Sequence, residues 1–220
     1  MKSGAISLTV SSAPAAASHE VPTRVNAARK LAARCASALG GRTFVLTTTL
    51  RSLQAVGTQL RSTFDAAGEQ IEVLVQGQGS KRQLMQRFLD APRAVLVGSQ
   101  SFWEGVDVPG AALQCVIIDK LPFPPPNDPL VEARVKRLES DGRNAFAEYF
   151  VAEAAVALKQ GAGRLIRSET DRGLLVVCDP RMATMGYGRR LFAALPPMTR
   201  IDDEAEAIAW LRELAGVPAT

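Results

Sequence analysis

The sequence has few of the residues on which most metal and redox sites depend. Of its 220 residues only one is a histidine, His19, and only three are cysteines. Cys35, Cys115 and Cys178 are far apart and include no C-x-x-C pair, so we expect them to be buried thiols in a reducing compartment. The chain therefore has too few ligands and bases for a zinc site, an iron–sulfur cluster or a histidine-based triad.

Other missing patterns exclude further classes of protein. No G-x-x-x-x-G-K-[ST] loop is present to bind phosphates, and three closely spaced glycine pairs lack the third glycine of a dinucleotide-binding fingerprint. No apolar run approaches the roughly 20 residues of a membrane span. The apolar run at residues 5–10 is short and interrupted by Ser and Thr, unlike a secretory signal. We therefore expect a cytoplasmic protein with no membrane partner.

The composition is that of an ordinary soluble domain, but its charge is unevenly distributed. The chain is 47% hydrophobic and 22% charged, with a net charge of +4. Residues 1–98 carry 12 basic and 5 acidic side chains, whereas residues 99–220 carry 14 and 17. The basic first half can attract a polyanion such as a nucleic acid, although basic helix faces are often simply solvated.

Hydrophobic patterns that alternate between helix and strand periods indicate an α/β fold. The expected strands are apolar on both faces, which is typical of a parallel sheet covered by helices on both sides. We predict a RecA-like three-layer domain over residues 20–200, after a linker at 1–19 with one short strand near Ile6–Val10. Residues 201–220 should form an acidic helix packed on or trailing the domain. The expected strands are 43–48, 71–75, 93–98, 114–119 and 173–179, and the expected helices are 22–39, 50–67, 80–90, 129–140, 144–167 and 202–214.

Ligands of such folds bind at the carboxyl ends of the strands. Residues 47–49, 99–110 and 119–126 each follow an expected strand, so they should project toward one edge of the sheet. Hydroxyl groups of Thr47 and Thr48 at that edge could contact a phosphate of single-stranded DNA. Threonine is also a common strand residue, so an ordinary strand end is the alternative.

The segment SQSFWEGVDVPG, which follows one of these strands, has two carboxylates in one turn. Glu104 and Asp107 could hold a metal, act as acid and base, or accept hydrogen bonds from ribose hydroxyls, and Gly105 permits a close backbone approach. An ordinary turn with an acidic rim is the alternative. Phe102 and Trp103 are expected to anchor the turn to the core rather than stack on a base.

The segment QGAGRLIR has an amide and two guanidinium groups at helical spacing. Gln160, Arg164 and Arg167 would lie on one helix face, one turn apart. Planar guanidinium groups on a common face suit a cluster of phosphate oxygens, and Gly163 would let another surface come close. A solvated basic helix end is the alternative.

These two segments resemble motifs V and VI of superfamily-two helicases, in the form found in DinG-type and XPD-type DNA helicases. The segment LPFPPPNDP is similar to the proline-rich stretch after motif V in the DinG-type branch. The resemblance covers about residues 20–200 and implies the second motor domain of an ATP-dependent DNA helicase. The positions that match the motif VI pattern are Gln160, Gly163, Arg164, Arg167, Asp171, Gly173, Asp179 and Arg181.

The resemblance also implies roles for individual residues. Arg164 and Arg167 would be arginine fingers that reach the γ-phosphate of ATP, and Gln160 would help to position it. The expected nucleotide-binding residues are Glu104, Gly105, Asp107 and Gly163, and the expected DNA-binding residues are Thr47, Thr48, Ser99 and Ser101.

The implied partners are single-stranded DNA and the N-terminal motor domain of the same protein, with a role in DNA repair. ATP with Mg²⁺ would be bound mainly by that first motor domain, so this chain alone should be inactive. The resemblance allows an iron–sulfur cluster in the full-length protein but not in this chain. Two other functions stay open: a non-catalytic module that docks nucleic acid or protein, and a metal-dependent enzyme centred on Glu104 and Asp107.

Overall fold

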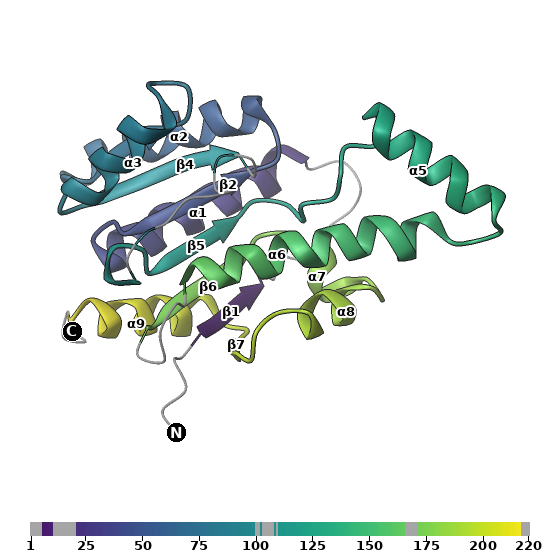
Figure 1. The fold of residues 1–220 in the computed structure, drawn as a ribbon. Coiled ribbons are helices and arrows are strands. Elements are labelled where there is room, and N and C mark those ends of the chain that lie inside the picture. The colour runs from purple at the N-terminus through teal and green to yellow at the C-terminus, as the bar shows by residue number, and fades with distance from the viewer. Residues whose placement is uncertain are drawn as a thin grey trace.

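The computed structural model describes residues 6–10, 21–99, 102, 108, 110–165 and 171–216. In these ranges the chain forms a seven-stranded sheet in which the paired strands are parallel, in the order β3-β4-β2-β5-β6-β1-β7 (Figure 1). The predicted α/β fold with a parallel sheet is confirmed. The strands are β1 (Ile6–Val10), β2 (Thr43–Thr47), β3 (Glu72–Val75), β4 (Ala94–Ser99), β5 (Cys115–Ile118), β6 (Gly173–Val177) and β7 (Thr199–Ile201).

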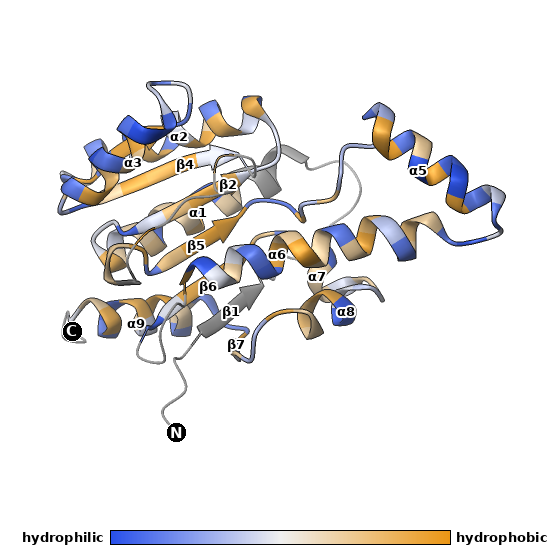
Figure 2. Cartoon of the chain, in the orientation of Figure 1, coloured by the Kyte–Doolittle hydropathy of each residue, from blue (hydrophilic) through white to orange (hydrophobic). Residues whose placement is uncertain are grey.

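Helices cover both faces of the sheet and make it a three-layer structure (Figure 1). Buried side chains of α1, α2 and α9 pack in the core on one face, and those of α3, α6 and α8 pack on the other. Figure 2 shows apolar residues concentrated in the strands and in stripes along the helices. The helices are α1 (Val21–Leu39), α2 (Leu50–Ala66), α3 (Lys81–Asp90), α5 (Pro129–Ser140), α6 (Val151–Leu165), α7 (Arg181–Thr184), α8 (Gly188–Ala193) and α9 (Glu204–Ala215).

Local sequence signals define several helix ends. Ser80 caps α3 through a capping box in which its hydroxyl accepts from the Gln83 N–H and the Gln83 side chain bonds back to the Ser80 N–H. Asp203 caps α9, which ends at Gly216 in the left-handed conformation. After α1, Gly41 has a φ of +97°, and a Cβ there would lie 2.5 Å from the backbone nitrogen of Ala94. These caps and glycines explain why the predicted helix ends are close to the observed ones.

Elements on either side of residues 20–200 pack with the predicted domain. The short strand predicted near Ile6–Val10 is confirmed as β1, which pairs with β6 on one side and β7 on the other. Strand β7 was not predicted because it is only three residues long. The acidic helix α9 packs on α1, which is one of the two predicted arrangements.

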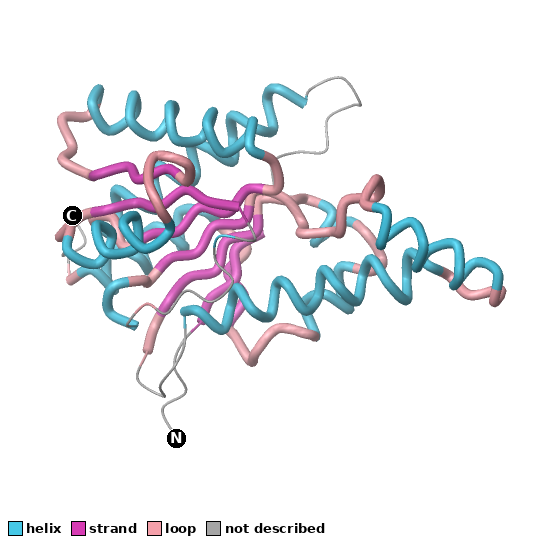
Figure 3. Tube along the Cα trace, turned by 45° about the horizontal axis from the view of Figure 1, so that its top comes forward, coloured by secondary structure: helices cyan, strands magenta, loops and turns pink. Residues whose placement is uncertain are grey.

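Helix α5 and the start of the next helix project past the carboxyl edge of the sheet (Figures 1 and 3). We call this projection, residues 129–150, the arm. Val131 is the buried residue of α5. The helix predicted over residues 144–167 begins with a π-helical turn, Phe146–Phe150, which continues directly into α6. Such turns are rare and frequently occur at functional sites.

Candidate nucleotide and DNA site

The last turns of α6 hold the described part of the glutamine–arginine motif. Helix α6 continues to Leu165, so Gln160 and Arg164 lie on one face, as the spacing predicted. Gln160 is exposed and Arg164 is half-buried. The opposite face packs into the core through Ala157, Leu158, Gly161, Ala162 and Leu165. Arg167 lies outside the described residues, so its predicted position next to Arg164 stays a prediction.

No contact within the described part of the chain explains the glycine at position 163. It is exposed within α6, and a Cβ built on it meets no heavy atom within 4 Å. A glycine inside a helix costs about 0.5–1 kcal/mol of stability relative to alanine. Nothing in the described chain requires a glycine at this position. The close approach of another surface would explain it.

The end of α6 lies at the amino edge of the sheet. A Cβ on Gly173, the first residue of β6, would lie 2.9 Å from the Leu165 side chain, which places the last turn of α6 beside the start of that strand. The expectation that ligands bind at the carboxyl edge therefore does not apply to Gln160 and Arg164. The reason is that a helix connecting parallel strands runs antiparallel to them and ends where the next strand begins.

The described candidate DNA-binding residues, Thr47, Thr48 and Ser99, lie at the carboxyl edge, as predicted. Thr47 and Ser99 are partners in the register of β2 and β4, so these strand ends are adjacent. Thr47 is 2% exposed and its hydroxyl donates to the carbonyl of Thr49 at 3.3 Å. Thr48 is exposed, and Ser99 is half-buried with its N–H donating to the Gln76 side chain at 2.7 Å. Thr48 therefore offers an accessible hydroxyl, whereas Thr47 offers none.

Most of the motif V segment lies outside the described residues. This applies to Ser101, Trp103, Glu104, Gly105 and Asp107, whose predicted roles stay predictions.

The two described residues of that segment are both buried. Phe102 is 6% exposed and Val108 is 1% exposed. The predicted anchoring role of Phe102 is confirmed, because its ring packs on Gly98, where an added Cβ would lie 3.3 Å from the ring. Val108 belongs to the same buried cluster as Ala162 and Leu165. Phe102, Val108 and the end of α6 therefore share one face of the sheet.

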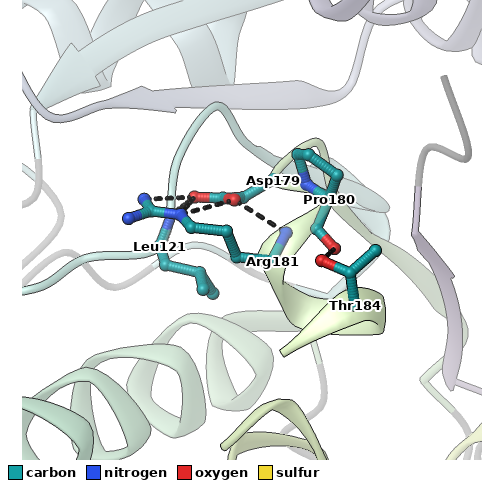
Figure 4. Close-up of polar contacts among 5 residues, drawn as sticks. All are labelled: Leu121, Asp179, Pro180, Arg181 and Thr184. Atoms are coloured by element: carbon teal, nitrogen blue, oxygen red, sulfur yellow. Dashed lines mark hydrogen bonds and ion pairs between the residues drawn. The ribbon is translucent and has the colours of Figure 1, made fainter. Parts of the chain in front are cut away.

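Asp179 joins the carboxyl ends of β5 and β6. Its buried carboxylate accepts from the Leu121 N–H at 3.0 Å, from the Arg181 N–H at 3.0 Å, and from the Arg181 guanidinium at 2.6–3.1 Å (Figure 4). Burial would raise the pKa of Asp179, but the hydrogen bonds from Arg181 and Leu121 outweigh it and hold the pKa below its ordinary value. We call Asp179 with Arg181 the clamp. It fixes the start of the proline-rich segment against the end of β6.

Asp119 is a second buried carboxylate at the carboxyl edge. Burial raises its pKa, and the charges of Lys120 and Arg29 oppose that rise. Its Oδ2 atom has no hydrogen-bond partner among the described residues. The neighbouring Cys178 thiol has its pKa raised well above the ordinary value by burial and by the charge of Asp119, so it stays protonated at neutral pH.

The sequence profile of the family described as "Helicase C-terminal domain" matches residues 32–198, most of the chain. This chain belongs to that family. The match covers both candidate groups, the strand ends with Thr48 and Ser99 and the end of α6, so the helicase resemblance is confirmed at the level of the family.

Two curated relatives show which proteins contain such a domain. The chain is 45% identical over 187 residues to the "ATP-dependent DNA helicase YoaA" of Escherichia coli (strain K12), which is 84% of this chain and 29% of that protein. It is 40% identical over 183 residues to the "ATP-dependent helicase DinG" of Mycobacterium tuberculosis (strain ATCC 25618 / H37Rv), 83% of this chain and 27% of that protein. This helicase C-terminal domain therefore spans less than a third of the length of these relatives.

Solved structures of helicases have the same fold. A structure titled "XPD_Helicase" superposes with a TM-score of 0.65 at 14% identity, over 91% of this chain and 36% of that chain. The structure of Saccharomyces cerevisiae Dbp5 bound to RNA and ADP BeF3 gives a TM-score of 0.58 at 14% identity, over 97% of this chain and 46% of that chain. At such identities the similarity concerns the fold alone, and it supports the predicted RecA-like architecture.

The cysteines and the candidate metal ligands are scattered in the described part of this helicase domain. Cys35 and Cys115 are buried free thiols, as predicted, whereas Cys178 is a free thiol that is only half-buried. Among the described residues no three His, Cys, Asp or Glu side chains are grouped to hold a metal ion. No helix in the described ranges is long and apolar enough to cross a bilayer.

Sequence reasoning did not anticipate the surroundings of the clamp. Asp179 and Arg181 were identified only as positions of a motif, without their bond to Leu121. The Arg181 guanidinium also lies 5.4 Å from the ring centre of Phe123 in the proline-rich segment. The sequence did signal the pairing of Arg181 with Asp179, because an arginine two residues after a strand-terminal aspartate can fold back onto it. It gave no signal for the contact with Phe123.

Proposed function

We propose that this chain is the second motor domain of an ATP-dependent DNA helicase and completes an ATP site that begins on a first motor domain. In this proposal Arg164 and Arg167 bind the γ-phosphate as charge develops on it, and Gln160 orients it. Glu104, Gly105 and Asp107 contact the nucleotide from motif V. ATP with Mg²⁺ is bound mainly by the first motor domain, because this sequence has no P-loop.

The geometry of α6 is the observation that supports this proposal most. Gln160 and Arg164 share one face of its last turns, and Gly163 between them faces open space. An arginine fork beside an uncovered glycine suits the approach of a second surface with a polyphosphate between the two. The names of the relatives, which are ATP-dependent helicases, agree with this use of the helix end.

A track for single-stranded DNA is the second part of the proposal. Thr48 and Ser99, together with Ser101, would contact DNA phosphates at the carboxyl edge through hydroxyl and backbone N–H groups. The DNA track and the nucleotide site would then lie toward opposite edges of the sheet. The motif V segment, which leads from the end of β4 to the start of β5, would contact both.

The proposal is tested by ATP hydrolysis in the longer protein that contains this domain. We expect Arg164→Ala to lower the kcat of DNA-stimulated hydrolysis by about 10³-fold or more, the lower limit for an arginine finger. Arg164→Lys should not restore the activity, because an ammonium group cannot make the bidentate contact. Lys159→Ala removes an exposed cation from the same helix and is the matched control, with no expected effect.

Intact hydrolysis in Arg164→Ala, with DNA binding retained, would instead favour the non-catalytic docking module. Metal-dependent activity that is lost in Asp107→Asn, but not in Arg164→Ala, would favour the metal-enzyme alternative.

A further inference from the structure

Four aromatic rings meet at the base of the arm without being buried. We call Phe123, Phe146, Phe150 and Tyr187 the ring cluster. The ring centre of Phe146 lies 5.7 Å from that of Phe123, 5.3 Å from that of Tyr187 and 6.1 Å from that of Phe150. The Phe146 side chain is 46% exposed and the other three are half-buried. Rings of this size normally lose most of their surface on folding, so an open cluster marks a contact surface.

The structure around the ring cluster holds the rings rigidly. Phe123 lies in the proline-rich segment, which has little backbone freedom. Its ring is covered on one side by the Arg181 guanidinium, which the clamp fixes through Asp179. Phe146 and Phe150 bound the π-helical turn, which places both rings toward the cluster. A rigid ring face costs little conformational entropy when a flat ligand stacks on it.

Besides Arg181, arginine side chains from α5 and α8 lie close to the ring cluster. Arg134 of α5 lies 5.4 Å from the ring centre of Tyr149, which in turn is 5.5 Å from that of Phe150. Arg190 of α8 donates to the carbonyl of Ala147, the residue after Phe146, at 3.3 Å.

Two acidic side chains also lie near the ring cluster, each in an exposed pair. Glu148 pairs with Arg143, and Glu153 pairs with Arg134 at 3.8 Å. Exposed pairs of this kind contribute little and open easily. Arg189 and Arg190, two adjacent exposed cations on α8, add positive charge close to Tyr187.

We infer that the ring cluster is a base-stacking site for single-stranded DNA. A nucleobase stacks on the exposed face of Phe146, and Arg190 binds the adjoining phosphate. Aromatic faces interleaved with arginines bind single strands with little sequence preference, because every base has a π face. The site lies where the arm leaves the carboxyl edge, the edge that also carries Thr48 and Ser99. The inference rests on the proposed function, since it extends the DNA track.

The inference is tested with the longer protein and a labelled oligothymidylate of about 15 nucleotides, by fluorescence anisotropy without ATP. Phe146→Leu keeps an apolar side chain but removes the ring, and it should weaken binding by about 5- to 100-fold, the range for one stacked base. Arg190→Gln should weaken binding and reduce its salt dependence. Leu130→Ala is the matched control, because Leu130 is a 77% exposed apolar residue of the same arm. The affinity of this variant for the oligonucleotide should equal that of the unaltered protein.

An abasic oligonucleotide of the same length separates stacking from other effects. The loss in Phe146→Leu should disappear with this ligand, because no base is left to stack. A photoreactive 5-iododeoxyuridine oligonucleotide bound to the unaltered protein should crosslink within residues 144–150, which tests the site without any substitution. Unchanged affinity in Phe146→Leu, or an equal loss with both oligonucleotides, would overturn the inference.

Other results distinguish a protein contact from the stacking site. If Phe146→Leu lowered the thermal midpoint of the longer protein while DNA affinity stayed constant, the ring cluster would be a contact between its domains, and the inference would be wrong. The result is also separable from the proposed function. If Arg164→Ala abolished ATP hydrolysis but Phe146→Leu bound DNA normally, the proposed motor function would stand. Only the stacking site would be ruled out.

Discussion

At the scale of single residues, Gly163 and Asp179 differ in whether contacts within the described chain explain them. Gly163 faces open space, so no contact within the described chain explains why this residue is a glycine. Asp179 is buried and accepts several hydrogen bonds, so contacts within the fold explain why this residue is an aspartate. The first residue should therefore matter for activity and the second for stability.

Gly163→Ala should separate these two properties. The new methyl group meets no neighbour, and alanine is a better helix former, so the free energy of unfolding should rise by about 0.5–1 kcal/mol. In the longer protein the same substitution should lower ATP hydrolysis, because the methyl group blocks the approach of the opposite wall. Denaturant unfolding and DNA-stimulated hydrolysis check the two parts. Gly186→Ala is a control glycine that also faces open space, and it should leave hydrolysis unchanged.

Asp179→Asn should destabilise the domain by about 1–3 kcal/mol, since a neutral amide replaces a carboxylate that accepts charge-assisted bonds. The pH dependence follows from the lowered pKa of Asp179. Its contribution is fully present above the unfolded pKa of about 3.9 and is lost as the pH falls through the lower folded pKa. Denaturation followed from pH 7 downward should therefore show a smaller acid loss in Asp179→Asn. An acid limb as steep as that of the unaltered protein would show that other carboxylates dominate it.

At the scale of elements, the sequence predicted what local chemistry controls. The apolar runs of β2 and β6 and the helical pattern of α3 identified these elements with small errors at their ends. The pairing of β1 between β6 and β7 was not predictable, because parallel neighbours are set by long-range packing rather than by local pattern. The π-helical turn also depends on tertiary contacts, since its rings pack on Phe123 and Tyr187.

The candidate site was predicted in part for the same reason. Helical spacing was enough to place Gln160 and Arg164 on one face, but not to place that face at the amino edge of the sheet. A threonine at a strand end was a sound candidate for a DNA contact, yet only the structure shows that Thr47 is buried and Thr48 exposed. The ring cluster escaped prediction because its members lie on three separate segments.

At the scale of the whole molecule, the chain is one helicase C-terminal domain that spans less than a third of its curated relatives. Such a domain has a complete core of its own, with buried clusters on both faces of the sheet. Its proposed chemistry, in contrast, is incomplete. Guanidinium groups can stabilise charge on a phosphate, but without a P-loop they have nothing to hold the nucleotide.

The central claim is that this domain supplies one wall of a shared ATP site, and steady-state ATP hydrolysis tests it most directly. We expect the isolated 220-residue chain to show no turnover above background, with or without single-stranded DNA. The longer protein should hydrolyse ATP, and Arg164→Ala should abolish that activity while its fold is retained by circular dichroism. Clear turnover by the isolated chain that disappears in Arg164→Ala or Arg167→Ala would contradict the account, because the site would then be complete within this domain.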